Sequence, residues 1–310
     1  MMRCANEMRD AFFDALYRHA VSDRRIIVLS NDFGAPSLDQ FRTNIPGQFV
    51  NAGISEQNII GVAAGLALAG KRVCVYSIAS FITLRCLEQI KIDLCTMRVP
   101  VMIAGVGPCF AYDTDGPTHH ATEDISLFRT LVDMTILSPC DSYAAAAMAD
   151  TISTNEGPSY VRLDRGKMPA IYADGISLDA GCRITRQGTD MCLVATGIMT
   201  HRAMEVAELL AVQGVSATVV DVYKLKPLPT AALLDAMRAS HRVAVIEEHT
   251  MQGGLGSMMA ELLADAGTAI PLLRLGIPDT ALYAYGQREA LQAACGLDRK
   301  SIVDRIIAWR

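Results

Sequence analysis

The sequence predicts an α/β protein of two domains, each a mostly parallel sheet covered by helices. Short apolar runs rich in Val, Ile and Leu alternate with longer stretches of helical periodicity along the chain. This alternation is typical of strand–helix–strand units with right-handed crossovers. The chain has 310 residues, enough for two domains of roughly 150 residues each.

The first series of elements is predicted over residues 1–172. The helix expected at 8–20 carries its aromatic residues near one face, and the run at 26–30 is β-branched, as buried strands are. The helix expected at 56–69 is apolar almost all round, so we expect it to be buried. The other elements predicted here are strands at 72–76, 101–104, 135–138 and 160–163 and helices at 82–97, 122–131 and 142–154.

Residues 173–188 are predicted to be an interdomain linker with some local strand, because glycines punctuate them without a sustained period. The second domain is then predicted at 189–310. Its elements are strands at 191–196, 217–220, 243–247 and 272–275 and helices at 201–213, 230–238, 256–266, 287–294 and 298–308.

Composition excludes several classes of protein. Hydrophobic residues make up 51% and charged residues 20% of the chain, which excludes intrinsic disorder. A net charge of −5 without a basic stretch argues against nucleic acid as a partner. No uncharged stretch is long enough to span a membrane, and residues 1–10 lack the apolar segment of a secretory signal. Nine cysteines without a CxxC pair predict buried, reduced thiols in a cytoplasmic protein, and six scattered histidines predict no metal site built by this chain.

Glu56 is the first candidate for chemistry, since it opens the apolar helix predicted at 56–69. A carboxyl at the beginning of a buried helix must be hydrogen-bonded or protonated, which makes Glu56 a candidate acid. The alternative is a first-turn Glu favoured by the helix dipole, with Ser55 or Asn51 as the cap.

Residues 113–120, Asp-Thr-Asp-Gly-Pro-Thr-His-His, form the second candidate. They lie on a long loop after a predicted strand, where α/β sheets bind their ligands. A solvated turn is the alternative, because Asp-Gly-Pro is common in turns. Arg9, Arg162 and Arg165 could bind a phosphate or carboxylate, although solvated ion pairs are the preferred interpretation of their spacing. Similarly, the glycines within 253–256 could surround an anion, although close strand–helix packing is preferred.

Together, and in this order, these segments resemble the transketolase family over nearly the whole chain. Residues 53–58 are similar to the segment whose glutamate activates thiamine diphosphate, and residues 115–119 to the substrate loop of the family. Phe81 resembles the aromatic residue that stacks on the aminopyrimidine, and residues 247–256 resemble the C-terminal domain.

The resemblance implies a role for each matching residue. The catalytic residues would be Glu56 and His119; cofactor contacts would come from Ile54, Glu56, Phe81 and Gln89, and substrate contacts from Arg9, Ser37, Asp115, His119 and Arg165. The carboxyl of Glu56 would face N1′ of the aminopyrimidine, and His119 would hydrogen-bond the donor sugar or the bound two-carbon fragment. Arg9, Ser37 and Arg165 would contact the phosphate of the acceptor, and Asp115 would bind a substrate hydroxyl.

The resemblance covers two of the three transketolase domains. The missing domain binds the diphosphate and Mg²⁺ through a Gly-Asp-Gly motif and a downstream Asn, neither of which we find. This implies the C-terminal subunit of a split transketolase, which transfers two-carbon ketol units between sugars or sugar phosphates. A separate N-terminal subunit would hold the diphosphate and metal, in an α2β2 assembly that includes contacts between copies of this chain.

Departures from the family leave the substrates open. Residues 107–110, Gly-Pro-Cys-Phe, lack the histidine that helps transketolases to bind the acceptor phosphate, and Leu87 stands where many members have Tyr. A deoxyxylulose-phosphate-synthase-like enzyme is one alternative, but it normally carries all three domains on one chain. The beta subunit of a 2-oxo-acid dehydrogenase is another, but its loop lacks Asp-Gly-Pro-Thr-His. A non-catalytic regulatory subunit would be expected to have lost the glutamate that is present here as Glu56.

Overall fold

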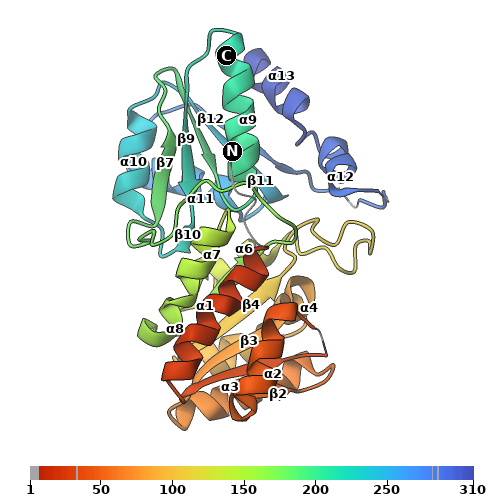
Figure 1. The fold of residues 1–310 in the computed structure, drawn as a ribbon. Helices are drawn as coiled ribbons and strands as arrows, with labels where there is room; N and C mark the ends of the chain where they lie inside the picture. The colour runs from red at the N-terminus through yellow and green to blue at the C-terminus, as the bar shows by residue number, and fades with distance from the viewer. Residues whose placement is uncertain (1–6, 33, 281, 285) are drawn as a thin grey trace.

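The computed structural model describes residues 7–32, 34–280, 282–284 and 286–310, and it confirms the predicted fold class. Two sheets lie one below the other in Figure 1, and helices cover both faces of each. The lower sheet contains, in spatial order, β10 (Lys224–Lys226), β5 (Thr135–Leu137), β6 (Ser159–Leu163), β4 (Val101–Val106), β3 (Arg72–Ile78), β1 (Ile26–Ser30) and β2 (Phe49–Asn51). The upper sheet contains β12 (Leu272–Ile277), β11 (Val243–Thr250), β8 (Met191–Ala195), β9 (Ala217–Val222) and β7 (Cys182–Arg186).

Both sheets are parallel except at one edge. Only β10 in the lower sheet and β7 in the upper sheet pair antiparallel with their neighbours among the described strands. The central strands are buried on both faces, which explains their continuous apolar runs.

One layer of helices packs on each face of each sheet. One face of the lower sheet carries α1 (Met8–Ser22), η1 (Pro36–Leu38), α2 (Asp39–Asn44), α7 (Ser142–Ala149) and α8 (Thr151–Thr154). The other carries α3 (Glu56–Leu68), α4 (Ala79–Leu84), α5 (Leu87–Gln89), η3 (Ile90–Thr96) and α6 (Asp124–Arg129). The short η2 (Pro46–Gln48) leads into β2. On the upper sheet, α9 (Met199–Val212), α12 (Arg288–Ala294) and α13 (Arg299–Trp309) oppose α10 (Thr230–Arg238) and α11 (Leu255–Asp265).

The two sheets share one hydrophobic core. Ile27 in β1, Phe128 in α6 and Leu225 in β10 belong to the same buried cluster as Val194 in β8. The strand β10 explains this continuity, because it follows β9 of the upper sheet in sequence but pairs with β5 of the lower sheet. A segment from the second half of the sequence therefore completes the first sheet, which ties the two domains together.

Three short strands were not among the predicted elements, namely β2, β7 and β10. Of these, β7 lies within the predicted linker 173–188, where some local strand was expected, and it forms the edge of the upper sheet. All three are edge strands, so they lack the continuous apolar runs that mark the strands buried on both faces.

The helix predicted at 82–97 is divided into α4, α5 and η3. The chain leaves helical geometry at Cys86, whose φ is −110°, and its thiol lies 3.8 Å from the carbonyl oxygen of Phe81. This break gives Arg85 a position at the end of α4, where its side chain turns towards α3.

One prediction about α3 is wrong for the chain by itself. The helix was expected to be buried all round, but Gly61, Val62, Gly65 and Leu68 are exposed. Val62 and Leu68 have exposed fractions of 42% and 62%, and no heavy atom lies within 4 Å of the position that a Cβ would take at Gly61 or Gly65. We call these four residues the exposed α3 face.

The eight cysteines in the described residues are all buried and free of disulfides, as predicted, and Cys4 lies outside those residues. Among the described helices, none combines the length and the hydropathy that a membrane crossing requires.

Candidate functional site

The predicted site residues follow the carboxyl ends of neighbouring strands in the lower sheet. Glu56 follows β2, Phe81 lies in α4 after β3, the loop 107–120 follows β4, and Arg165 follows β6. Because these ends share one edge of a parallel sheet, residues far apart in sequence can meet there.

Glu56 is buried, with an exposed fraction of 5%, and its Oε2 lies 2.6 Å from Nη1 of Arg85. The expectation that this carboxyl is hydrogen-bonded is therefore confirmed. The same guanidinium lies over the ring of Phe81, with Cζ 4.7 Å from the ring centroid. A carboxylate, a planar cation and an aromatic face thus form one stack.

The caps suggested for α3 are wrong. Ser55 occupies the N-cap position, but its hydroxyl donates to the carbonyl of Ala52 and not to the helix. The side chain of Asn51 accepts instead from the N–H of Gly53. The first turn of α3 therefore has no side-chain cap, and its acidic group is Glu56.

His119 lies beside Phe81, although the two are far apart in sequence. Their ring centroids are 4.9 Å apart in an edge arrangement, and the ring of Tyr112 is 5.7 Å from His119. The hydroxyl of Thr118 lies 3.1 Å from Nδ1 of His119. Since Nε2 has no hydrogen-bond partner among the described residues, it is the ring nitrogen available to a ligand.

Tyr112 contacts two of the predicted site residues, although the sequence analysis did not name it. The guanidinium of Arg165 lies over the ring of Tyr112, with Cζ of Arg165 4.3 Å from the ring centroid. The same ring packs over Gly107. A Cβ at position 107, where φ is +73°, would lie 2.1 Å from Cε2 of Tyr112, so only glycine fits there. The sequence feature that could have indicated Tyr112 is an aromatic residue in a polar loop, a few positions after a glycine.

The hydroxyl of Tyr112 is buried and has no hydrogen-bond partner in the part of the chain described here. Burial raises the pKa of Tyr112 to about 12, and the guanidinium groups of Arg165 and Arg9 oppose that rise. The two arginines predicted to contact the phosphate therefore influence the same phenol.

Arg9 and Ser37 meet at a third residue. Arg9 Nε lies 3.1 Å from Oδ1 of Asp10, and the hydroxyl of Ser37 donates to the same oxygen over 3.0 Å. Arg9 also pairs with Glu7 at 3.3 Å. Two carboxylates thus already balance the charge of Arg9. Among the described residues, the guanidinium of Arg165 instead donates only to the carbonyl of Ala111, over 3.3 Å.

Three of the predicted residues have few contacts with the other site residues. Asp115 is exposed, and its backbone N–H donates to the carbonyl of Tyr112. Oε1 of Gln89 is buried without a hydrogen-bond partner among the described residues. Ile54 has an exposed fraction of 79%, so this chain alone does not bring it against the other site residues.

Arg162 is not solvated, contrary to the preferred interpretation of its spacing. Its side chain is buried, and Nε donates to Oδ2 of Asp124 over 2.7 Å. The hydroxyl of Tyr160 donates to the same carboxylate oxygen over 2.8 Å. Because the pair is sealed inside the domain, Arg162 holds α6 against β6 and is not available to substrate.

The glycines at 253–256 do surround an anion, but it belongs to the chain itself. The carboxylate of Glu247 accepts from the backbone N–H groups of Leu255, over 2.6 Å, and Gly256, over 2.9 Å. A Cβ at Gly254 or Gly256 would lie within 3 Å of that carboxylate. Burial raises the pKa of Glu247 to about 7, against the lowering effect of the two N–H donors.

The comparisons with known proteins agree with this geometry. The family model of the transketolase pyrimidine binding domain matches residues 5–170, and that of the transketolase C-terminal domain matches residues 180–302. This chain belongs to the transketolase family. Family membership implies the use of thiamine diphosphate.

Relatives that match this chain over nearly their whole length are transketolase subunits. The chain is 34% identical over 304 residues to one of the subunits of the apulose-4-phosphate transketolase of Phocaeicola vulgatus, covering 96% of each protein. It is 34% identical over 298 residues to the 6-deoxy-6-sulfo-D-fructose transketolase subunit SqwH of a Clostridium species, covering 96% of this chain and 92% of that one. A solved split-gene transketolase, described as an inactive beta4 tetramer, superposes with a TM-score of 0.87 at 33% identity over 97% of this chain and 96% of that one. The chain thus corresponds to one subunit of a split transketolase.

Within the described ranges, no group of three His, Cys, Asp or Glu side chains lies close enough together to hold a metal ion.

Proposed function

We propose that this transketolase subunit works with a separate N-terminal subunit that holds the diphosphate of the cofactor and Mg²⁺. The assembly transfers two-carbon ketol units between sugar derivatives in carbohydrate metabolism, and at least one of these derivatives carries an anionic group. The observation that carries this proposal is the meeting of Glu56, Phe81 and His119 at one edge of the sheet.

The residues present fit the aminopyrimidine half of thiamine diphosphate. The guanidinium of Arg85 lies over the ring of Phe81 and donates to the buried carboxylate of Glu56. A planar group with N–H donors therefore already occupies this place, and an aminopyrimidine has the same two properties. Gln89 adds a buried amide oxygen without a partner among the described residues, which could accept from such a ligand.

When bound, thiamine diphosphate supplies the carbon that attacks the ketose and holds the electron pair after C–C cleavage. Glu56 would hold a proton at a ring nitrogen, because its buried carboxyl is most easily satisfied by a hydrogen-bond partner. Phe81 would orient the ring by stacking. Arg85, which is 46% exposed, can move into solvent to make room.

His119 and Asp115 would bind the hydroxyls of the sugar. Contacts with Phe81 and Tyr112 fix the imidazole of His119, and its Nε2 is the free ring nitrogen in the described structure. A fixed imidazole can hydrogen-bond a hydroxyl and hold it in position. The exposed carboxylate of Asp115 accepts hydrogen bonds from a further hydroxyl.

Arg165 is the residue best placed to bind the anionic group of the acceptor. Its guanidinium is stacked on Tyr112, and no carboxylate within the described residues forms an ion pair with it. Arg9 would contribute only if the anion competes with Asp10 and Glu7. Guanidinium groups bind phosphate and other tetrahedral anions through charge-assisted hydrogen bonds.

The exposed α3 face supports the proposed assembly. Its residues are apolar or lack side chains and follow Glu56 in the same helix, and no part of the chain that the structure describes covers them. Exposed apolar faces of this kind mark protein–protein interfaces. We therefore place a subunit contact beside Glu56, and we propose an α2β2 assembly that includes contact between copies of this chain.

The proposal is tested by reconstitution with a companion chain from the same source that carries Gly-Asp-Gly and a downstream Asn. With thiamine diphosphate and Mg²⁺, the mixture should cleave a ketose phosphate in a single turnover and then transfer two carbons to an aldose, followed by mass spectrometry. The isolated chain should bind the cofactor weakly in calorimetry. A mixture that binds the cofactor but cleaves none of a panel of phosphorylated and sulfonated ketoses would overturn the proposed activity.

A further inference from the structure

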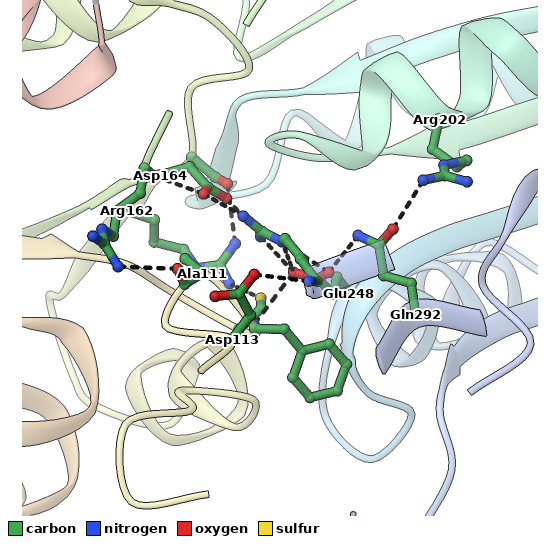
Figure 2. A network of polar contacts seen from close by, with 12 residues as sticks. Ala111, Asp113, Arg162, Asp164, Arg202, Glu248 and Gln292 are labelled. Atoms are coloured by element: carbon green, nitrogen blue, oxygen red, sulfur yellow. Dashed lines mark hydrogen bonds and ion pairs between the residues drawn. The ribbon is translucent and has the colours of Figure 1, made fainter. Parts of the chain in front are cut away.

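Arg288, the first residue of α12, connects the two domains beside the substrate loop. Its Nη1 and Nη2 donate to Oδ1 and Oδ2 of Asp164, over 2.6 Å and 2.8 Å, and its Nε donates to Glu248 over 3.1 Å. Its backbone N–H donates to Oδ2 of Asp113 over 2.8 Å. Figure 2 shows Asp113, Asp164 and Glu248 converging between the domains, with Gln292 on the far side of Glu248.

The same network holds successive positions of the loop 107–120. The N–H of Phe110 lies 3.4 Å from Oε2 of Glu248, and the carbonyl of Ala111 accepts from Arg165. Asp113 is held by Arg288 itself. The segment that leads to Asp115 is therefore fixed by groups outside the loop, and most of these belong to the C-terminal domain.

The arrangement also fixes Arg165 relative to that segment. Asp164, which receives both Nη groups of Arg288, is the residue next to Arg165 at the end of β6. Arg288 thus holds the loop through the bond from its backbone N–H to Asp113, and it holds the strand end through the bonds from its side chain to Asp164. The planar guanidinium of Arg288 makes paired hydrogen bonds to Asp164 and to Glu248. Such paired bonds leave the side chain little rotational freedom.

From this geometry we propose that Arg288 is a positioning residue for the acceptor, which sets the distance between Arg165 and the loop residues Tyr112 and Asp115. The proposal rests on the proposed ketol transfer and gives the C-terminal domain a part in the site. Arg288 touches neither substrate nor cofactor in this role. His119 keeps its contact with Phe81 at the other end of the loop, so donor cleavage should depend on Arg288 much less.

Asp113→Ala is the informative variant. Removing Arg288 itself would leave the carboxylates of Asp164 and Glu248 buried without their cation, which endangers folding. Asp113 is partly exposed, and its loss removes only the tie to the Arg288 backbone and a local bond to the N–H of Thr114. Asp174→Ala is the matched control, because Asp174 makes the same local bond to the next residue but no interdomain contact among the described residues.

Two measurements separate the possible outcomes. In the isolated chain, amide hydrogen exchange in peptides covering 107–120 should become about tenfold faster in Asp113→Ala and stay unchanged in Asp174→Ala. In the reconstituted enzyme, KM for the acceptor should rise about tenfold, while single-turnover donor cleavage stays within twofold, because displacing a positioned group weakens only the step that uses it. The melting temperature should remain the same.

The proposal is overturned if loop exchange is unchanged, or if the acceptor and donor steps slow by the same factor. It is also overturned if the loop loosens while the acceptor KM stays at the wild-type value. If the wild-type mixture itself fails to cleave any donor, the proposed function fails, and the exchange experiment still reports on the loop.

Discussion

The replacement of Glu56 by glutamine tests the centre of the proposed site. The carboxylate is buried, and its described partner is the guanidinium of Arg85, at 2.6 Å. Glutamine has the same size and still accepts a hydrogen bond from Arg85, but it cannot hold a titratable proton. The change therefore removes acid–base function and leaves packing in place.

The expected loss of activity is large and the expected loss of stability is small. General acid–base groups contribute about 10²–10⁴-fold to rate, so turnover of the reconstituted enzyme should fall by that factor. The ion pair that is lost involves Arg85, whose side chain is 46% exposed, and pairs screened by solvent in this way contribute no more than about 1 kcal/mol. No cavity forms, so the unfolding midpoint in urea should be close to that of the wild type.

The assay is hydrogen–deuterium exchange at C2 of the bound cofactor, measured by NMR after acid quench, beside steady-state turnover. Glu88→Gln is the matched control, since it makes the same chemical change at an exposed glutamate near the site, and both quantities should stay within about twofold of the wild type. Wild-type exchange at C2 in Glu56→Gln would refute the reasoning, because Glu56 would then be only a helix-terminal residue.

Three further predictions concern other parts of the molecule. Tyr112→Phe removes a buried hydroxyl that has no described partner, so the isolated chain should gain about 1 kcal/mol in urea unfolding; a loss would reveal a native partner for the hydroxyl. For Glu247, burial raises the pKa from 4.5 to about 7, so the folded state binds more protons and wild-type stability falls as pH rises between these values. Relative to Glu247→Gln, the wild type should lose about 3 kcal/mol between pH 4.5 and 7 in urea unfolding, and parallel pH profiles would contradict this. Gly65→Arg should abolish subunit assembly, measured by size-exclusion chromatography with light scattering. It should not unfold the chain, because the new Cβ would meet no atom. The control Val212→Arg, at an exposed position of α9, should assemble normally, and normal assembly of Gly65→Arg would remove the exposed α3 face from the interface.

The parts of this protein that the sequence alone determined are those that depend on neighbours along the chain. The central strands are buried on both faces, so their Val- and Ile-rich runs were visible without a partner. The burial of Glu56 followed from the apolar helix that it opens. The order of motifs along the chain indicated the family, and the position of residues 113–120 after a predicted strand placed this loop where α/β sheets bind ligands.

The remaining features were decided by contacts between segments that are distant in sequence. Arg162 was expected in solvent because its spacing showed no partner, and only the fold brings Asp124 against it. The exposed side of α3 could likewise not be predicted from the apolar residues of this helix. Such a pattern indicates that a face is buried, but it does not tell whether the same chain or another chain covers that face. Arg288 and Asp164 are separated by 124 positions, and nothing local marks either of them. An ion pair stabilises the fold through the geometry of two side chains in space, so its partners are chosen by tertiary packing and not by the pattern of the sequence.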